Sequence, residues 1–201
     1  MQFSSGQRDL AIRAMEEAEE RTTGYYCIPP HRWQQLRYDM ITRRDREWEP
    51  LPDAALAQVQ RMRHVRPSGM ASCDFYRIQL NDPSILLAAR RENLEPDLYP
   101  FLVYILTHEM VHLVRLSSIL PDGTEFPHSP CEEESRVHNV AYRILSNAAD
   151  RQMGPILSKF CLAETRTVQV PEQLLMSGRY SAAPAEPFRR VHRVSRRRLG
   201  G

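Results

Sequence analysis

The chain has 201 residues, with 27 basic and 25 acidic side chains and a formal net charge of +2. This length suits one domain with a hydrophobic core, and the balanced charge argues against a chain that binds polyanions over its whole surface. No stretch approaches the roughly 20 apolar residues of a membrane-spanning helix, and the start of the chain lacks the pattern of a secretory signal. The four cysteines have no paired spacing. We therefore expect reduced thiols and a soluble, cytoplasmic protein without a membrane partner.

The predicted elements before residue 92 are mostly helices. Helical spacing of apolar residues and a proline at a helix start support most of them, whereas strict alternation of inward and outward residues indicates one strand. In chain order we expect helices over residues 7–22, 31–42 and 53–62, a strand over 72–80 and a helix up to residue 91. The sequence thus predicts an α+β fold that is predominantly helical and has a small sheet.

A further predicted helix carries the most informative motif. Residues 101–116 are apolar nearly all round, as expected for a helix inside a core, and they contain His108-Glu109-Met110-Val111-His112. Residues four apart share a helix face, so both imidazoles can bind one metal ion while Glu109 points to the same opening. A catalytic Zn²⁺ site has three protein ligands and one position for water. The motif therefore predicts a zinc site that needs one more ligand.

Three consecutive glutamates begin the next predicted helix and can supply that ligand. The apolar stripe of this helix runs through Val137 and Ala141, and stepping back by helical intervals reaches Glu133 and Glu134 but passes Glu132. Glu134 fits best, Glu133 is the alternate, and Glu132 ranks third. All three are also consistent with an acidic first turn that the helix dipole favours.

Two further side chains share these helix faces. His138 lies four residues after Glu134 and could be an extra ligand, a partner that orients the ligands or a donor to the substrate. Arg115 follows His112 by three residues and could pair with a carboxylate of the second helix or hold a substrate carboxylate.

Over residues 99–146 the chain resembles the zincin metallopeptidases. Within them it resembles the gluzincins, in which a second helix supplies a glutamate ligand after the pentapeptide. The resemblance implies a zincin-like core around the active-site helix, a peptide or protein substrate, and an edge strand that pairs with extended substrate. The predicted strand over residues 72–80 is the candidate for that edge strand.

These patterns predict a zinc-dependent peptidase or amide hydrolase. Glu109 would serve as the general base for a metal-activated water, and His138 is the second candidate catalytic residue. One alternative is a non-catalytic metal-binding or regulatory protein on the same scaffold. Another is a dimetal site built from Glu109, His112, Glu134 and His138.

The remaining segments divide the chain into a domain and a tail. The proline-rich connection over residues 121–130 is a candidate lid, in which His128 could reach the reaction centre. We expect a single domain over residues 1–178, with a last helical turn over 171–176. Residues 179–201 form a basic tail that has little to bury, so any contact with nucleic acid would be made through this tail.

Overall fold

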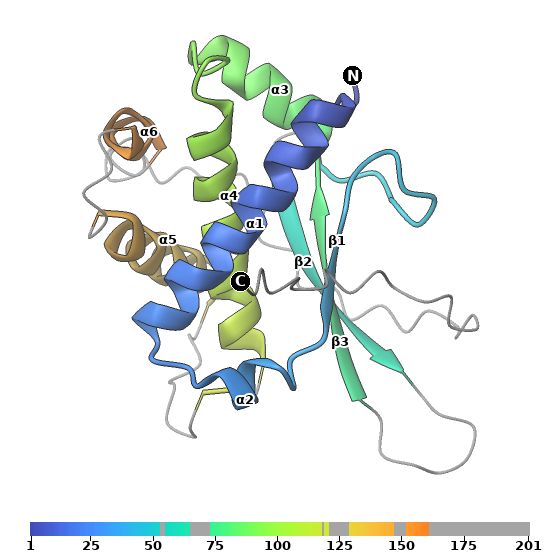
Figure 1. Cartoon of the computed structure of the whole chain (residues 1–201), viewed down its shortest axis with the longest axis vertical. Coiled ribbons are helices and arrows are strands. Elements are labelled where there is room, and N and C mark those ends of the chain that lie inside the picture. Colours follow the sequence, from blue (N-terminus) through green and yellow to red (C-terminus); the bar gives the residue numbers. More distant parts are fainter. Residues whose placement is uncertain (53–54, 65–72, 118, 121–128, 147–151, 161–201) are drawn as a thin grey trace, which may run out of the picture.

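The computed structural model describes residues 1–52, 55–64, 73–117, 119–120, 129–146 and 152–160. This part of the chain forms helices and strands that Figure 1 labels. In chain order they are α1 (Ser5–Tyr25), α2 (Pro30–Trp33), β1 (Tyr38–Ile41), β2 (Ala57–His64), β3 (Cys73–Leu80), α3 (Asp82–Arg91), α4 (Leu98–Leu116), α5 (Pro130–Ser146) and α6 (Met153–Phe160). The fold is α+β and mostly helical, as the sequence predicted.

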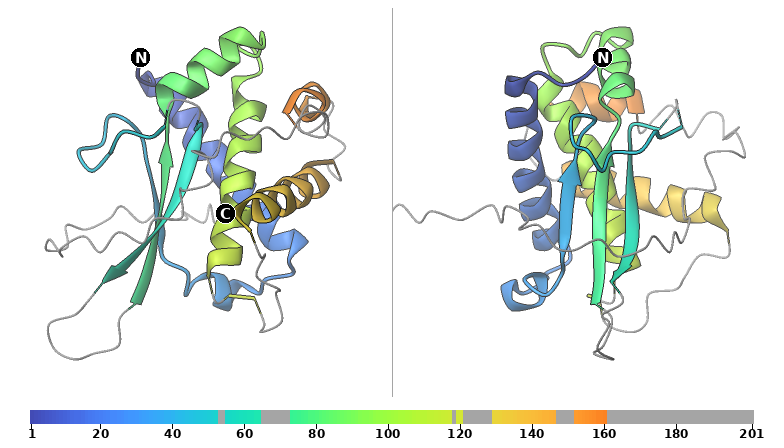
Figure 2. Two further views of the ribbon diagram at one scale, coloured as in Figure 1. Left: turned by 180° about the vertical axis from the view of Figure 1, so that it is seen from behind. Right: turned by 90° about the vertical axis from the view of Figure 1, so that its right-hand side faces the viewer.

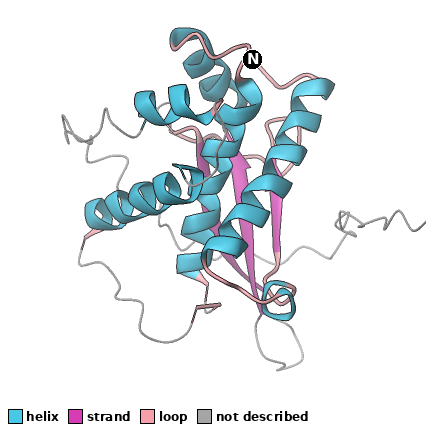
Figure 3. Ribbon diagram, turned by 60° about the vertical axis from the view of Figure 1, so that its left-hand side comes forward, coloured by secondary structure: helices cyan, strands magenta, loops and turns pink. Residues whose placement is uncertain are grey.

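The strands form one sheet in the order β1-β3-β2. β1 runs parallel to β3, with Tyr38 opposite Tyr76, whereas β2 runs antiparallel to β3, with Val59 opposite Ile78. Tyr76, Ile78 and Leu80 are all buried, so every second residue of β3 faces the core, as its sequence alternation predicted. The helices α1, α4, α5 and α6 lie on one side of this sheet (Figures 1 and 3).

Helix α4 is the centre of the core. Its residues from Pro100 to Val111 are all buried, and the helix contacts α1, α5, α6 and β2. A helix without a polar face can be stable only when neighbours cover it on all sides, and each large apolar side chain buried in this way contributes about 1.5–3 kcal/mol. The surroundings of α4 therefore fix the positions of His108 and Glu109.

Helix α1 is fixed at its start and near its end by polar contacts. Ser4 and Gln7 form a capping box, in which each side chain accepts a hydrogen bond from the other residue's backbone N–H. Near the other end, the Glu19 carboxylate accepts hydrogen bonds from Trp33 Nε1 at 2.7 Å and from the Tyr38 hydroxyl at 2.6 Å. Glu19 thus ties α1 to α2 and to the first strand of the sheet.

Two predicted helices are wrong. Residues 31–42 form only the end of α2 and then β1, and most of residues 53–62 lie in β2. In β2, Val59 is buried opposite Ile78. Pairing with β3 provides hydrogen-bond partners for the backbone of this segment. The spacing of apolar residues within the segment cannot reveal this contribution, because it comes from a strand elsewhere in the sequence.

The strand expected at the sheet edge is in fact central. β3 lies between β1 and β2, so the edge strand nearest α4 is β2, which contacts that helix (Figure 2). The candidate lid with His128, the expected helical turn over residues 171–176 and the basic tail over 179–201 lie outside the described residues. None of the helices that the structure describes is both long enough and apolar enough to cross a lipid bilayer.

Candidate metal centre

Helices α4 and α5 pack together and bring four potential metal donors to one place. The Oε1 atom of Glu134 lies 3.0 Å from His108 Nε2 and 3.4 Å from His138 Nε2, and its Oε2 atom lies 3.2 Å from His112 Nε2. The Nε2 atoms of His108 and His112 are 3.1 Å apart. Each helix supplies two of the donors at a spacing of four residues, which places both on one face.

The chemistry and spacing of these donors fit a zinc ion. Imidazole nitrogen and carboxylate oxygen are ligands that zinc prefers, and two such ligands on a tetrahedral zinc lie about 3.4 Å apart. The separations among His108, His112 and Glu134 are 3.0–3.2 Å, so small side-chain movements would create this geometry. The predicted zinc ligands are therefore the residues that the fold brings together.

The three glutamates at the start of α5 have different surroundings. Glu134 faces the histidines, whereas Glu133 accepts two hydrogen bonds from the Arg115 guanidinium, at 2.6 and 2.7 Å. Glu132 is exposed in the first turn. Of the two roles considered for Arg115, the structure shows the ion pair with the second helix. This pair holds α5 against α4 beside the donors.

Glu109 is buried next to the donors. Glu109 is only 6% exposed, and the backbone N–H of Val59 on β2 lies near its carboxylate and lowers its pKa. Burial raises the pKa of Glu109 to about 7 and outweighs the stabilising charges of nearby histidines. A carboxylate with such a pKa is suited to accept and release a proton near neutral pH.

Burial and the Glu134 carboxylate set the protonation of the donors. Burial lowers the pKa of His108 to about 4, which keeps its imidazole neutral. Burial also opposes a charge on His112, but contacts with Glu134 and the charge of Glu109 together raise its pKa above the ordinary value. Burial likewise opposes ionisation of Glu134, yet its hydrogen bonds with His108, His112 and His138 hold its pKa well below the usual range. Glu134 is therefore a carboxylate, the form that binds a metal.

The Nδ1 atoms of His108 and His138, which point away from the cluster of donors, differ in their hydrogen-bond partners. The hydroxyl of Tyr104, on α4, lies 3.4 Å from His138 Nδ1. The Nδ1 atom of His108 is buried and has no hydrogen-bond partner among the described residues. Histidines that bind metals usually donate their second ring N–H to a neighbouring group. The surroundings of His138 meet this condition.

Sequence reasoning missed two groups near the donors. Tyr104 lies four residues before His108 on the same helix face, a signal that was present in the sequence. The N–H of Val59 gave no signal, because its segment was expected to be helical.

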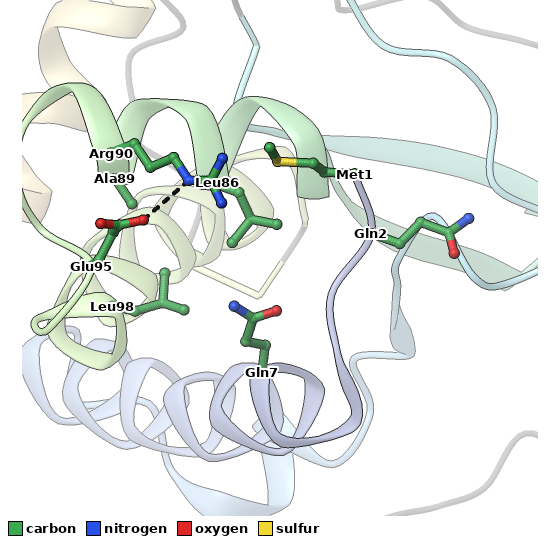
Figure 4. Close-up of a pocket in the computed structure, with 8 residues that line it drawn as sticks. All are labelled: Met1, Gln2, Gln7, Leu86, Ala89, Arg90, Glu95 and Leu98. Carbon is green, nitrogen blue, oxygen red and sulfur yellow. Dashed lines mark hydrogen bonds and ion pairs between the residues drawn. The ribbon is translucent and has the colours of Figure 1, made fainter.

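A separate cavity of about 340 Å³ lies at the opposite end of α4 (Figure 4). Leu86 and Leu98 line it together with the ion pair between Arg90 and Glu95. Leu98 is the first residue of α4 and precedes His108 by ten positions, about 15 Å along the helix axis. This cavity is therefore distinct from the candidate metal centre.

Comparisons with known proteins do not add a family to this description. No protein-family model, no curated protein and no solved structure matches the chain.

Proposed function

We propose that this protein is a zinc-dependent peptidase or amide hydrolase with a zincin-like core. The observation that carries the proposal is the convergence of His108, His112 and Glu134, with donor separations of 3.0–3.2 Å, beside the buried carboxylate of Glu109. Three ligands with an adjacent general base are the parts of a hydrolytic zinc site.

Each residue has a definite task in this proposal. His108, His112 and Glu134 hold the zinc ion, which when bound polarises a carbonyl group and makes a coordinated water more acidic. Glu109 accepts a proton from the attacking water and passes it to the nitrogen of the leaving amine. Burial raises the pKa of Glu109 to about 7 in the metal-free protein, and the charge of a bound zinc ion would lower it toward the range in which the carboxylate is ionised and can act as a base. Arg115 and Glu133 keep α5, and with it Glu134, in place.

The position of β2 favours an extended peptide as the substrate. The carbonyl of Leu56 accepts a hydrogen bond from the Asn81 N–H at the end of the antiparallel pair, so by the alternation of such a pair the backbone of Val59 faces away from β3. In an antiparallel pair, the backbone groups of successive residues point alternately toward and away from the partner strand. Ala57 and Arg61, two residues before and after Val59, therefore have the same orientation as Val59. Among the described strands only β3 pairs with β2, and an extended peptide could add to the other side of β2 through backbone hydrogen bonds. Its scissile bond would then run past Glu109 and the ligands.

One observation favours a second candidate, a non-catalytic metal-binding or regulatory protein. His138 Nε2 lies 3.4 Å from Glu134 and adds a fourth possible donor to the cluster. A zinc ion with four protein ligands is typical of structural sites. The two candidates differ in whether the metal-loaded protein turns over a substrate.

The test combines zinc analysis with cleavage of a peptide library by the full-length chain. We expect about one zinc per chain in the wild type, cleavage that stops on chelation and returns with zinc, and loss of both zinc and cleavage in His108→Ala. Glu132→Gln, which alters an exposed glutamate of α5, is the matched control and should retain both. Zinc retention by His108→Ala would refute the site, and a zinc-loaded wild type that cleaves no peptide would support the non-catalytic candidate.

A further inference from the structure

We propose that His138 is a fourth protein ligand of the metal ion, so that the resting centre is closed by four side chains. This inference rests on the proposed metal centre and changes its expected behaviour. The donor atoms of His108, Glu134 and His138 all lie within 4.8 Å of one another. The cluster therefore contains two overlapping sets of three donors, which share His108 and Glu134 and differ in His112 or His138.

The geometry of α5 supports ligation by His138. Glu134 and His138 are four residues apart on α5, as His108 and His112 are on α4, so two helix faces each present two donors. The imidazole of His138 packs against that of His108, with 4.5 Å between ring centroids. Its Nε2 atom is directed at the Oε1 atom of Glu134 rather than at solvent.

Tyr104 gives His138 the orientation that a ligand needs. The Tyr104 side chain is 5% exposed and packs on Phe160, with 5.6 Å between ring centroids, so its hydroxyl is held in place. When His138 carries its proton on Nδ1, this N–H faces the Tyr104 oxygen at 3.4 Å, and Nε2, which faces Glu134, presents its lone pair to a metal ion in the cluster. Tyr104 is a positioning residue in this arrangement.

A closed centre has a chemical consequence. Catalytic zinc sites keep one position for water or substrate, whereas a site with four protein ligands does not. In this protein the water that the proposed hydrolysis needs, like any small ligand, has to displace His138 or be accepted as a fifth ligand. Exogenous anions should therefore bind weakly to the wild type and more tightly once His138 is removed.

Cobalt substitution of the full-length chain tests this inference without relying on catalysis. Co²⁺ in the wild type should give the intense visible bands of a four-coordinate site. His138→Ala should change these bands, bind Co²⁺ and Zn²⁺ at least about 10-fold more weakly, and bind azide at least about 10-fold more tightly. Added imidazole should restore the wild-type bands. Asn139→Ala, an exposed neighbour on α5, is the matched control and should leave all readouts unchanged.

The outcomes separate this inference from the proposed centre. Wild-type bands and wild-type azide affinity in His138→Ala would overturn ligation by His138 while leaving the other three ligands in place. A wild type that binds no Co²⁺ would overturn both. If His138→Ala does not fold, His138→Gln supplies the same comparison. Tyr104→Phe should keep the cobalt bands and weaken metal binding less than His138→Ala, whereas a larger loss would contradict a positioning role.

Discussion

At the residue scale, burial determines what the ionisable groups can do. Glu109 and His108 are 6% and 9% exposed, and in both cases burial disfavours the charged form. A neutral His108 is ready to bind a metal, and Glu109 is poised to exchange a proton near neutral pH. Glu134 is less buried and is held as a carboxylate by the three histidines. One cluster thus contains a carboxyl group whose pKa is near neutral, a neutral imidazole and an ionised carboxylate.

Glu109 should destabilise the metal-free protein at high pH. Its pKa rises on folding from about 4.5 to about 7. The ionised side chain therefore destabilises the folded protein fully above pH 7 and not at all below pH 4.5, where the group is protonated in both states. Glu109→Gln should therefore raise the melting temperature in chelator at pH 8, by the equivalent of roughly 3 kcal/mol at most, and leave it unchanged at pH 4. Equal melting temperatures at pH 8 would show that the carboxylate is not desolvated.

The third ligand gives a second prediction. Glu134→Ala removes the carboxylate that touches His108 and His112, so zinc affinity measured by chelator competition should fall by more than about 100-fold. Glu132→Ala alters an exposed side chain and should leave the affinity unchanged. The reverse order would mean that α5 presents a different face to α4.

Helical phase explains why this part of the site could be predicted. In a helix with 3.6 residues per turn, Glu132 and Glu134 point to nearly opposite sides. The apolar stripe through Val137 shows that the side with Glu134 faces inward. His138 and Arg115 followed from the same reasoning. The Val59 N–H could not be predicted, because its place beside Glu109 depends on a strand that is distant in sequence.

At the element scale, the contact between α4 and α5 holds the donors together. The Arg115–Glu133 pair is the largely buried link between these helices, with side-chain exposures of 13% and 23%. Bidentate pairing fixes both the distance and the rotation of α5. The pair thus contributes to the site although neither side chain is a proposed ligand.

Breaking this pair should weaken both the fold and the site. Arg115→Met leaves the Glu133 carboxylate without its partner, so we expect a loss of about 2 kcal/mol in denaturant unfolding and a zinc affinity about 10-fold lower. Arg90→Met removes an exposed pair with Glu95, at 56% and 63% exposure, and should cost less than about 1 kcal/mol. Equal effects of the two substitutions would exclude a clamping role for Arg115.

Local patterns at this scale succeeded for the core elements and failed for the edge strands. The periodicity of apolar residues predicted α1 and β3, and the nearly continuous apolar sequence of α4 predicted a buried helix. β1 and β2 are short or polar, and neighbouring prolines suggested helix starts. Their conformation depends on pairing with β3.

At the scale of the whole molecule, the described strands and helices place β2, the strand at one edge of the sheet, next to the donors. β2 borders the site because β3 occupies the centre of the sheet. The sequence revealed the fold class but could not reveal this strand order, because order is set by contacts between segments far apart in the chain. The central claim, hydrolysis with Glu109 as the base, depends on this arrangement as well as on the motif.

The most direct test of that claim measures zinc content and peptide hydrolysis on one preparation of Glu109→Gln. Glutamine keeps the size and hydrogen bonding of the side chain but cannot accept the proton. We expect zinc to stay near one equivalent while turnover falls by a factor of roughly 100 or more. Loss of zinc together with activity would indicate that Glu109 is a metal ligand, and wild-type hydrolysis by the variant would contradict the proposed mechanism.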